Sequence, residues 1–159
     1  MAAHPSGAEI DGVRVLPLQT YPDDRGYFRE VFRTDALSEV SIAQTSVTET
    51  YPGVVKAFHW HKHQDDLWYV AKGMAQIVLY DRREGSKTHG VTQVIYAGEQ
   101  QPQLVFIPRR VAHGYRVLGV APVLLFYHTT EAYDPDAPDE RRIPYDDPAI
   151  GFDWTTKHR

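Results

Sequence analysis

Histidines occupy alternate positions in the glycine-bounded segment 53–73, at His59, His61 and His63. Alternate residues of an extended strand point to the same face, so the three imidazoles are expected on one side of a strand. Asp66 follows three residues after the last of them. Imidazole is suited to moving protons near neutral pH, and imidazoles together with a carboxylate also suit transition metals. The segment therefore predicts a strand that faces a polar cavity and carries proton-transfer or metal chemistry.

Short strands are expected to position these side chains. Alternating or β-branched segments recur along the chain between Gly, Pro and Asp residues, a pattern typical of a β-sandwich or barrel. Besides the histidine strand, the expected strands span residues 13–18, 27–32, 43–50, 67–71, 74–81, 91–96, 104–107, 114–118 and 123–130. Residues 35–40 are a modest helix candidate of one or two turns. The sequence predicts an all-β fold with at least eight strands in two facing sheets and little helix.

The length and composition limit the possible classes of protein. A chain of 159 residues favours one domain over 1–159, with a loose arm at 1–12 and an irregular, Pro- and Asp-rich tail at 133–159. The net charge of −4 provides no basic field, so nucleic acid is not an expected partner. No apolar run approaches about 18 residues and the first residues lack a signal pattern, so no membrane partner and a cytoplasmic location are expected. The absence of cysteine excludes disulfides and thiolate chemistry.

A second motif, IPRRVAHGYRV at 107–117, places His113 directly before a glycine. Together the two segments read G-x5-H-x-H-x4-D-x6-G and P-x-R-x2-H, which resembles the two motifs of the cupins. The resemblance implies a double-stranded β-helix, or jelly roll, and carries the cupin metal ligands onto His59, His61, Asp66 and His113. Such a set suits one divalent ion of iron, manganese, nickel or zinc.

A narrower resemblance rests on six segments that occur in the same order as in dTDP-4-dehydrorhamnose 3,5-epimerases. They are RGYFRE at 25–30, GVVKAFH at 53–59, YDRREGSKTHG at 80–90, IPRRVAHGY at 107–115, FYHTTEAYDP at 126–135 and YDDPAIGFDW at 145–154. The resemblance covers residues 13–154 and implies a cupin-fold homodimer without a metal or other cofactor. It implies a nucleotide-linked 4-keto-6-deoxy sugar as substrate, with proton transfer at the carbons next to the ketone.

The same resemblance implies roles for individual residues. His59 falls on the catalytic base, and Tyr127 falls on the acid that returns a proton to the opposite face of the sugar. Further positions fall on the substrate-binding residues of the family, some of which would reach the partner subunit's site. These are Arg25, Phe28, Glu30, Gln44, Lys56, His61, His113 and Tyr133.

Three features depart from the epimerase pattern. Asp66 stands where the family has a Lys that would steady the enolate. The family's base is oriented by an Asp in a C-terminal segment, and no equivalent follows the DW pair here, so His59 is expected to lack that partner. His61 is an addition, and HWHK is similar to the H-A-H-K of sugar 3,4-ketoisomerases. Two alternatives therefore stay open: a metal-dependent cupin enzyme with a three-His, one-Asp site, and a non-catalytic sugar-binding cupin.

Overall fold

The computed structural model describes residues 8–158, which form twelve strands and no helix. The strands are β1 (Arg14–Pro17), β2 (Tyr21–Asp23), β3 (Gly26–Phe28), β4 (Gln44–Thr50), β5 (Val55–His61), β6 (Asp66–Lys72), β7 (Met74–Asp81), β8 (Thr92–Gly98), β9 (Gln103–Ile107), β10 (Val111–Leu118), β11 (Val123–Thr129) and β12 (Glu140–Arg142). The all-β prediction is confirmed, and the described residues contain no helix that could cross a membrane.

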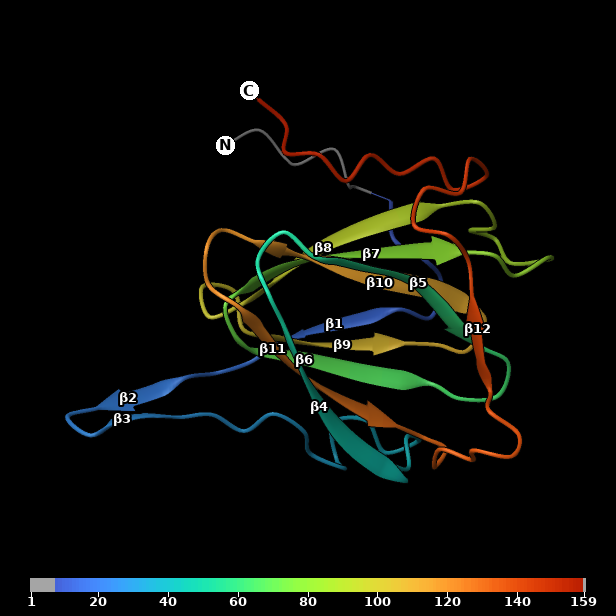
Figure 1. The fold of residues 1–159 in the computed structure, drawn as a ribbon. Helices are drawn as coiled ribbons and strands as arrows, with labels where there is room; N and C mark the ends of the chain where they lie inside the picture. The colour runs from blue at the N-terminus through green and yellow to red at the C-terminus, as the bar shows by residue number, and fades with distance from the viewer. Residues whose placement is uncertain (1–7, 159) are drawn as a thin grey trace.

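Two five-stranded antiparallel sheets face each other (Figure 1). One has the order β1-β9-β6-β11-β4, and the other has the order β12-β5-β10-β7-β8. Consecutive strands such as β5 and β6 lie in different sheets, so the chain crosses repeatedly from one layer to the other. This is the jelly-roll arrangement that the cupin resemblance implied.

The main core fills the space between the sheets. Residues of β7 and β9 alternate in direction, so that Ile77, Leu79, Val105 and Ile107 all have less than 2% of their surface exposed. Burial of this apolar surface is the main force that holds the layers together. The core occupies one part of the interlayer space and leaves polar side chains of β5, β6 and β10 at the other.

Three local expectations need correction. Residues 35–40 form turns, with the Val40 amide donating to the Leu37 carbonyl, because both side chains turn inward onto the outer face of the β9-β6 sheet. The arm is not loose at Ile10, whose side chain is buried in the main core. The tail is not irregular throughout, because β12 pairs with β5. Residues 1–7 of the expected arm lie outside the described residues.

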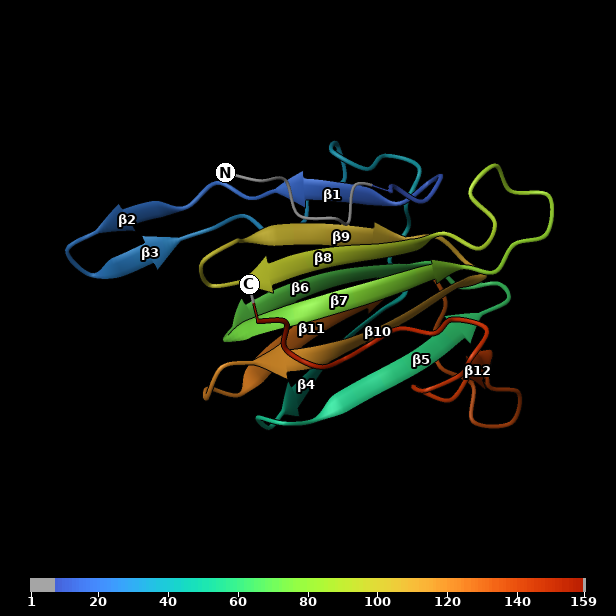
Figure 2. The ribbon, with the colours of Figure 1, turned by 90° about the horizontal axis from the view of Figure 1, so that it is seen from above.

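The β2–β3 hairpin projects away from both sheets in two perpendicular views (Figures 1 and 2). Its strands pair only with each other, with Tyr21 opposite Phe28. Tyr21, Tyr27 and Phe28 expose 53–63% of their surface. An isolated two-stranded hairpin is marginally stable in water, so this element gains from packing against another surface.

Gly114 controls how closely β5 approaches β10. A Cβ atom at this position would lie 2.3 Å from the Cβ of Ala57, so only glycine fits between the strands. The β10–β5 register shifts between His113 and Tyr115, on either side of this glycine. The close approach brings the histidines of the two strands together on one face.

Asp81 anchors the loop that follows β7. Its fully buried carboxylate accepts hydrogen bonds from Arg83, Ser86 and Thr88. Burial by itself would raise the pKa of this carboxyl, but the donors, led by Arg83, outweigh it and hold the pKa well below its usual range. Because the folded-state pKa lies below the unfolded value of about 4, the ionised carboxylate stabilises the fold above that pH.

We therefore expect Asp81→Asn to lower the free energy of unfolding by about 2 kcal/mol at pH 7. The stability of the wild type should fall as the pH drops below 4, and the stability of the variant should fall less. Urea denaturation at pH 7 and pH 3 measures both effects, and the exposed Asp146→Asn serves as the matched control. Equal pH dependence in the wild type and Asp81→Asn would contradict this role.

Candidate active site between the two sheets

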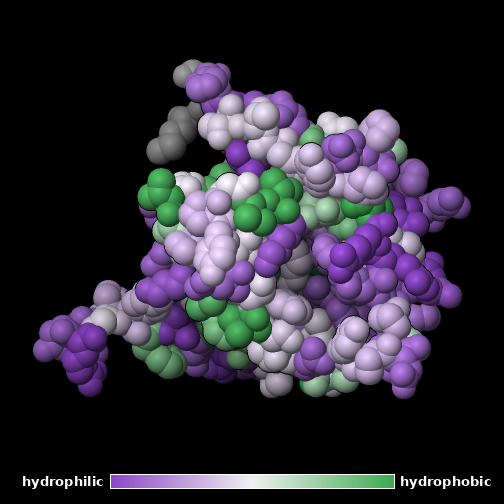
Figure 3. Space-filling view, viewed as in Figure 1, coloured by the Kyte–Doolittle hydropathy of each residue, from purple (hydrophilic) through white to green (hydrophobic). Residues whose placement is uncertain are grey.

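A cavity of about 1030 Å³ opens between the sheets. The face seen in Figure 3 is hollowed near its centre and carries hydrophilic side chains along its right-hand rim. Strands of both sheets and the segment before β12 line it. The lining residues that carry polar or titratable groups include Gln44, Lys56, His59, His61, His63, Asp66, His113, Tyr127, Tyr133, Asp139 and Glu140.

Strand β5 presents His59 and His61 to the cavity, as the alternation predicted. The intervening side chains point to the other face, where Phe58 is fully buried and packs against Trp154 at a ring separation of 5.5 Å. His63 lies beyond the end of the strand and is exposed at the cavity rim. One strand therefore supplies both a hydrophobic contact and the polar wall of the site.

Glu140 on β12 holds the ring of His59. Its Oε1 atom is the hydrogen-bond partner of His59 Nδ1, and β12 pairs antiparallel with β5 to bring the two together. A carboxylate oxygen can only accept, so the proton of a neutral His59 sits on Nδ1 and its Nε2 carries a lone pair. The expectation that His59 lacks an orienting acid is wrong, because Glu140 provides one from a different strand.

Tyr127 reaches the cavity from the opposite sheet. It lies on β11, whose neighbours β4 and β6 place Ser46 and Trp68 beside it. His59 belongs to the β5 sheet, so the two side chains approach the same cavity from opposite layers. A base and an acid on opposite sides of a bound molecule are what inversion of a carbon centre requires.

His61, Asp66 and His113 form a second group in the cavity. Their potential ligand atoms all lie within 4.8 Å of one another, with His61 Nε2 3.8 Å and His113 Nε2 3.7 Å from the Asp66 carboxylate. His59, the fourth residue of the expected metal set, is not in this group and is held by Glu140 instead. The structure thus brings three of the four expected ligands together.

His113 is as enclosed as Asp66, with 3% of its surface exposed. Burial lowers the pKa of its imidazole to about 4, although the nearby Asp66 carboxylate acts in the opposite direction. The ring is therefore neutral at pH 7. Its Nδ1–H donates to the Val111 carbonyl at 3.1 Å, and Trp68 packs edge-on against it at 5.0 Å between ring centroids.

Three of the other expected substrate-binding residues also line the cavity. Lys56 Nζ donates to the Thr48 hydroxyl, and the side-chain oxygen Oε1 of Gln44 accepts from the backbone amide of Tyr133 at 2.8 Å. These contacts hold β4, β5 and the segment after β11 together along one rim of the cavity. The rim combines a cation, an amide and an exposed aromatic ring, which can bind a phosphate and a flat base.

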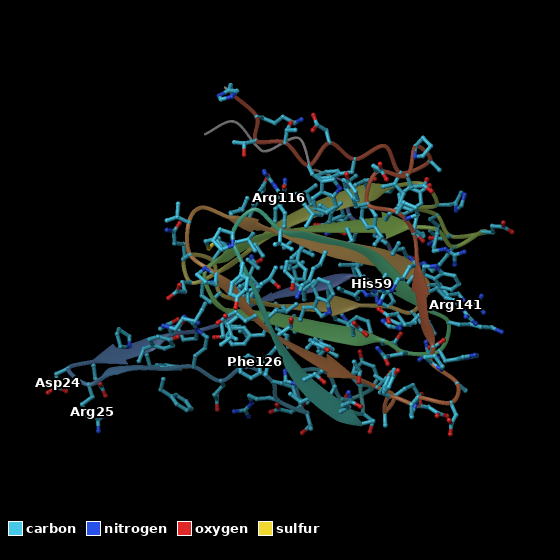
Figure 4. The ribbon with its side chains drawn as sticks, in the orientation of Figure 1. Asp24, Arg25, His59, Arg116, Phe126 and Arg141 are labelled. Carbon is cyan, nitrogen blue, oxygen red and sulfur yellow. The ribbon has the colours of Figure 1, made fainter. Side chains whose placement is uncertain are left out.

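Arg25, Phe28 and Glu30 do not reach the cavity of their own chain. Arg25 lies at the tip of the projecting hairpin, well away from His59 in the body of the two sheets (Figure 4). Its guanidinium pairs with Asp23, and Glu30 pairs with Arg33. Within one chain, these residues and the exposed Phe28 make no contribution to the site.

Glu140 and Asp139 are two acids of the cavity lining that the sequence did not indicate. The Asp139 carboxylate accepts from the backbone amides of Lys62, His63 and Gln64 and so fixes the turn after β5. Burial acts to raise the pKa of Asp139, but these hydrogen bonds outweigh it and lower the pKa. In the sequence, their only mark is that they form an adjacent pair of acids in the tail. Nothing in the residue spacing of the tail indicates that it pairs with β5.

The family model for dTDP-4-dehydrorhamnose 3,5-epimerase matches residues 7–159. The spore coat polysaccharide biosynthesis protein SpsL of Bacillus subtilis is 55% identical over 150 residues, covering 94% of this chain and 99% of that protein. The probable low-salt glycan biosynthesis epimerase Agl13 of Haloferax volcanii is 40% identical over 93% of this chain and 96% of its own length.

Solved structures agree with these matches. A dTDP sugar isomerase from Desulfovibrio desulfuricans superposes with a TM-score of 0.84 at 28% identity, covering 91% of this chain and 92% of that one. An epimerase from Legionella pneumophila in complex with dTDP-4-keto-L-rhamnose gives 0.84 at 28% identity, over 96% and 83%. The chain is thus a cupin-fold protein of the dTDP-sugar isomerase class. More narrowly, it belongs to the dTDP-4-dehydrorhamnose 3,5-epimerase family.

The Glu140 contact predicts the tautomer of His59. In the wild type at neutral pH, we expect the proton of His59 on Nδ1, because Glu140 accepts it there. Glu140→Ala should shift the ring toward a mixture of both tautomers. Long-range ¹⁵N–¹H spectra measure this, with His59→Gln to assign the signals and Glu84→Ala as a remote control. An Nε2-protonated His59 in the wild type would contradict the arrangement.

Proposed function

We propose that this protein is a nucleotide-sugar epimerase that acts on a dTDP-4-keto-6-deoxy sugar at the carbons next to the ketone. The observation that carries the proposal is the Glu140-held His59 on one sheet and Tyr127 on the other, both lining one cavity. The Legionella pneumophila relative, whose solved complex contains dTDP-4-keto-L-rhamnose, supports this substrate class.

His59 is suited to remove the first proton. A C4 ketone acidifies the C–H bonds at C3 and C5, because the electron pair left behind is delocalised into the carbonyl as an enolate. His59 Nε2 carries the lone pair that accepts this proton, and Glu140 stabilises the imidazolium that results.

Tyr127 is suited to complete the inversion. Its phenol donates a proton to the enolate carbon from the face opposite His59, which regenerates the ketone with the inverted configuration. Solvent then returns a proton to the phenolate and takes one from His59. The reaction consumes no oxidant or reductant, so these two groups account for every proton that moves.

The cavity also suits the nucleotide portion of the substrate. Its volume of about 1030 Å³ lies at the upper end of small-molecule sites, as a nucleotide sugar requires. Lys56 supplies positive charge for a diphosphate, and the exposed ring of Tyr133 offers a surface for a base. A sugar-binding cupin without catalysis needs no carboxylate behind a cavity histidine, so the His59–Glu140 pair favours the enzyme over that alternative.

Two variants should separate exchange from inversion. His59→Ala should abolish solvent-deuterium incorporation at the carbon next to the ketone, because no base remains. Tyr127→Phe should retain exchange but slow inversion by about 100- to 10,000-fold, because the enolate forms and is reprotonated from the side it left. NMR of a dTDP-4-keto-6-deoxy sugar in deuterated buffer follows both reactions. His89→Ala, which alters a histidine outside the cavity, is the matched control. Full inversion by Tyr127→Phe would contradict its role.

We also propose a homodimer in which the β2–β3 hairpin of one chain packs against its partner. The exposed Tyr21, Tyr27 and Phe28 provide the apolar surface for this contact, and the hairpin tip would bring Arg25 to the partner's cavity. The cytoplasmic location expected from the sequence stays a prediction.

Sedimentation at micromolar concentration tests the dimer. The wild type should sediment as a dimer of 18.2 kDa chains, and Phe28→Ser should shift it toward monomer because the hairpin loses its apolar contact. Val120→Ser removes an even more exposed apolar side chain, 94% accessible in the β10–β11 turn, and should change nothing. A monomeric wild type would contradict both the dimer and a substrate contact from Arg25.

A further inference from the structure

We propose that His61, Asp66 and His113 bind one divalent transition-metal ion at the floor of the cavity. Two imidazoles and one carboxylate, with space for further ligands, suit zinc and the neighbouring first-row ions. A tetrahedral ion with ligands at about 2.1 Å holds them about 3.4 Å apart. His61 lies 3.8 Å from one Asp66 oxygen and His113 lies 3.7 Å from the other, and all the ligand atoms lie within 4.8 Å of one another. Side-chain movements of about 1 Å would therefore bring the three groups to the spacing of a bound ion.

The hydrogen bond of His113 to Val111 leaves its other ring nitrogen facing the Asp66 carboxylate. Its Nδ1 must be the protonated nitrogen, because its partner is the carbonyl of Val111. The other ring nitrogen, Nε2, lies 3.7 Å from Asp66 Oδ2, beyond hydrogen-bond distance. A cation between these two atoms would bind both of them. The Val111 contact is also the kind of outer interaction that orients a metal-binding imidazole.

His61 is available as the second imidazole ligand. Its buried Nδ1 atom has no hydrogen-bond partner among the described residues, and its Nε2 atom lies 3.8 Å from Asp66 Oδ1. The side chain is 13% exposed, so water replaces few of the missing contacts. No competing contact therefore holds the ring, which lies 5.4 Å from the ring of His113.

Asp66 is a buried carboxylate with no positively charged group within hydrogen-bond distance among the described residues. It is 3% exposed and accepts one hydrogen bond on each oxygen, from Gln64 at 2.7 Å and from Trp68 at 3.1 Å. Both donors are neutral, and neither histidine is within hydrogen-bond distance. Burying a carboxylate in this way is costly unless it is paired or coordinates a metal. The Gln64 and Trp68 contacts would orient the carboxylate toward the ion.

The site is separate from the base, so binding an ion would not remove His59 from proton transfer. His59 is absent from the cluster, and its Nδ1 is occupied by Glu140. A role for the ion in the reaction rests on the proposed function: it would supply the positive charge near a carbonyl oxygen that Asp66 cannot supply itself. The binding site does not depend on that role.

Titration with Co²⁺ and Zn²⁺ tests the site directly. Full-length protein purified without a histidine tag and stripped with chelator should bind one ion per chain. Bound Co²⁺ should show the visible absorption of a low-symmetry site, and Zn²⁺ should displace it. His61→Ala and Asp66→Asn should each weaken binding by at least about 100-fold, since even outer contacts cost 10- to 100-fold. His89→Ala, an exposed histidine elsewhere, should bind as the wild type does.

The outcomes separate this site from the proposed reaction. Absence of binding by the wild type at millimolar Co²⁺ overturns the site, as does unchanged binding by a folded His61→Ala variant. Circular dichroism checks the fold of each variant, and His61→Ala keeps the test valid if Asp66→Asn does not fold. Metal binding without deuterium exchange would leave the site standing and remove the epimerase proposal. Deuterium exchange by a wild-type protein that binds no ion would support the epimerase proposal and overturn the metal site.

Discussion

The pairing of β5 with two neighbours, β10 and β12, determines where every candidate catalytic group of this sheet lies. On one side, β10 approaches closely because Gly114 has no side chain to strike Ala57, and His113 becomes the direct neighbour of His59. On the other side, β12 delivers Glu140. Loss of either pairing would separate the groups that must act together.

The cavity divides its histidines between two tasks. His59 is tied to a carboxylate that fixes one nitrogen and leaves the other available, which prepares it to accept a proton. His61 and His113 instead face a shared buried carboxylate. The alternation that puts His59 and His61 on one face of β5 does not make them equivalent, because His59 meets Glu140 of the neighbouring strand and His61 faces Asp66 of the opposite sheet.

Much of this arrangement follows from local sequence. Alternation with a period of two identified β11 and the inward face of the histidine strand β5, because a strand with one face in the core and the other toward a polar cavity follows that pattern. Residues 35–40 were misassigned since their apolar spacing also suits a pair of turns packed on a sheet. Glu140 could not be found, because its partner lies 81 residues away and β12 is three residues long.

A crystal structure of the protein with a bound dTDP-linked 6-deoxy sugar tests the central claim most directly. The account predicts that the sugar ring lies between the two sheets, with His59 Nε2 facing one side of the carbon next to C4 and the Tyr127 hydroxyl facing the other. A sugar bound outside the cavity, or His59 and Tyr127 on the same face of the ring, would contradict it.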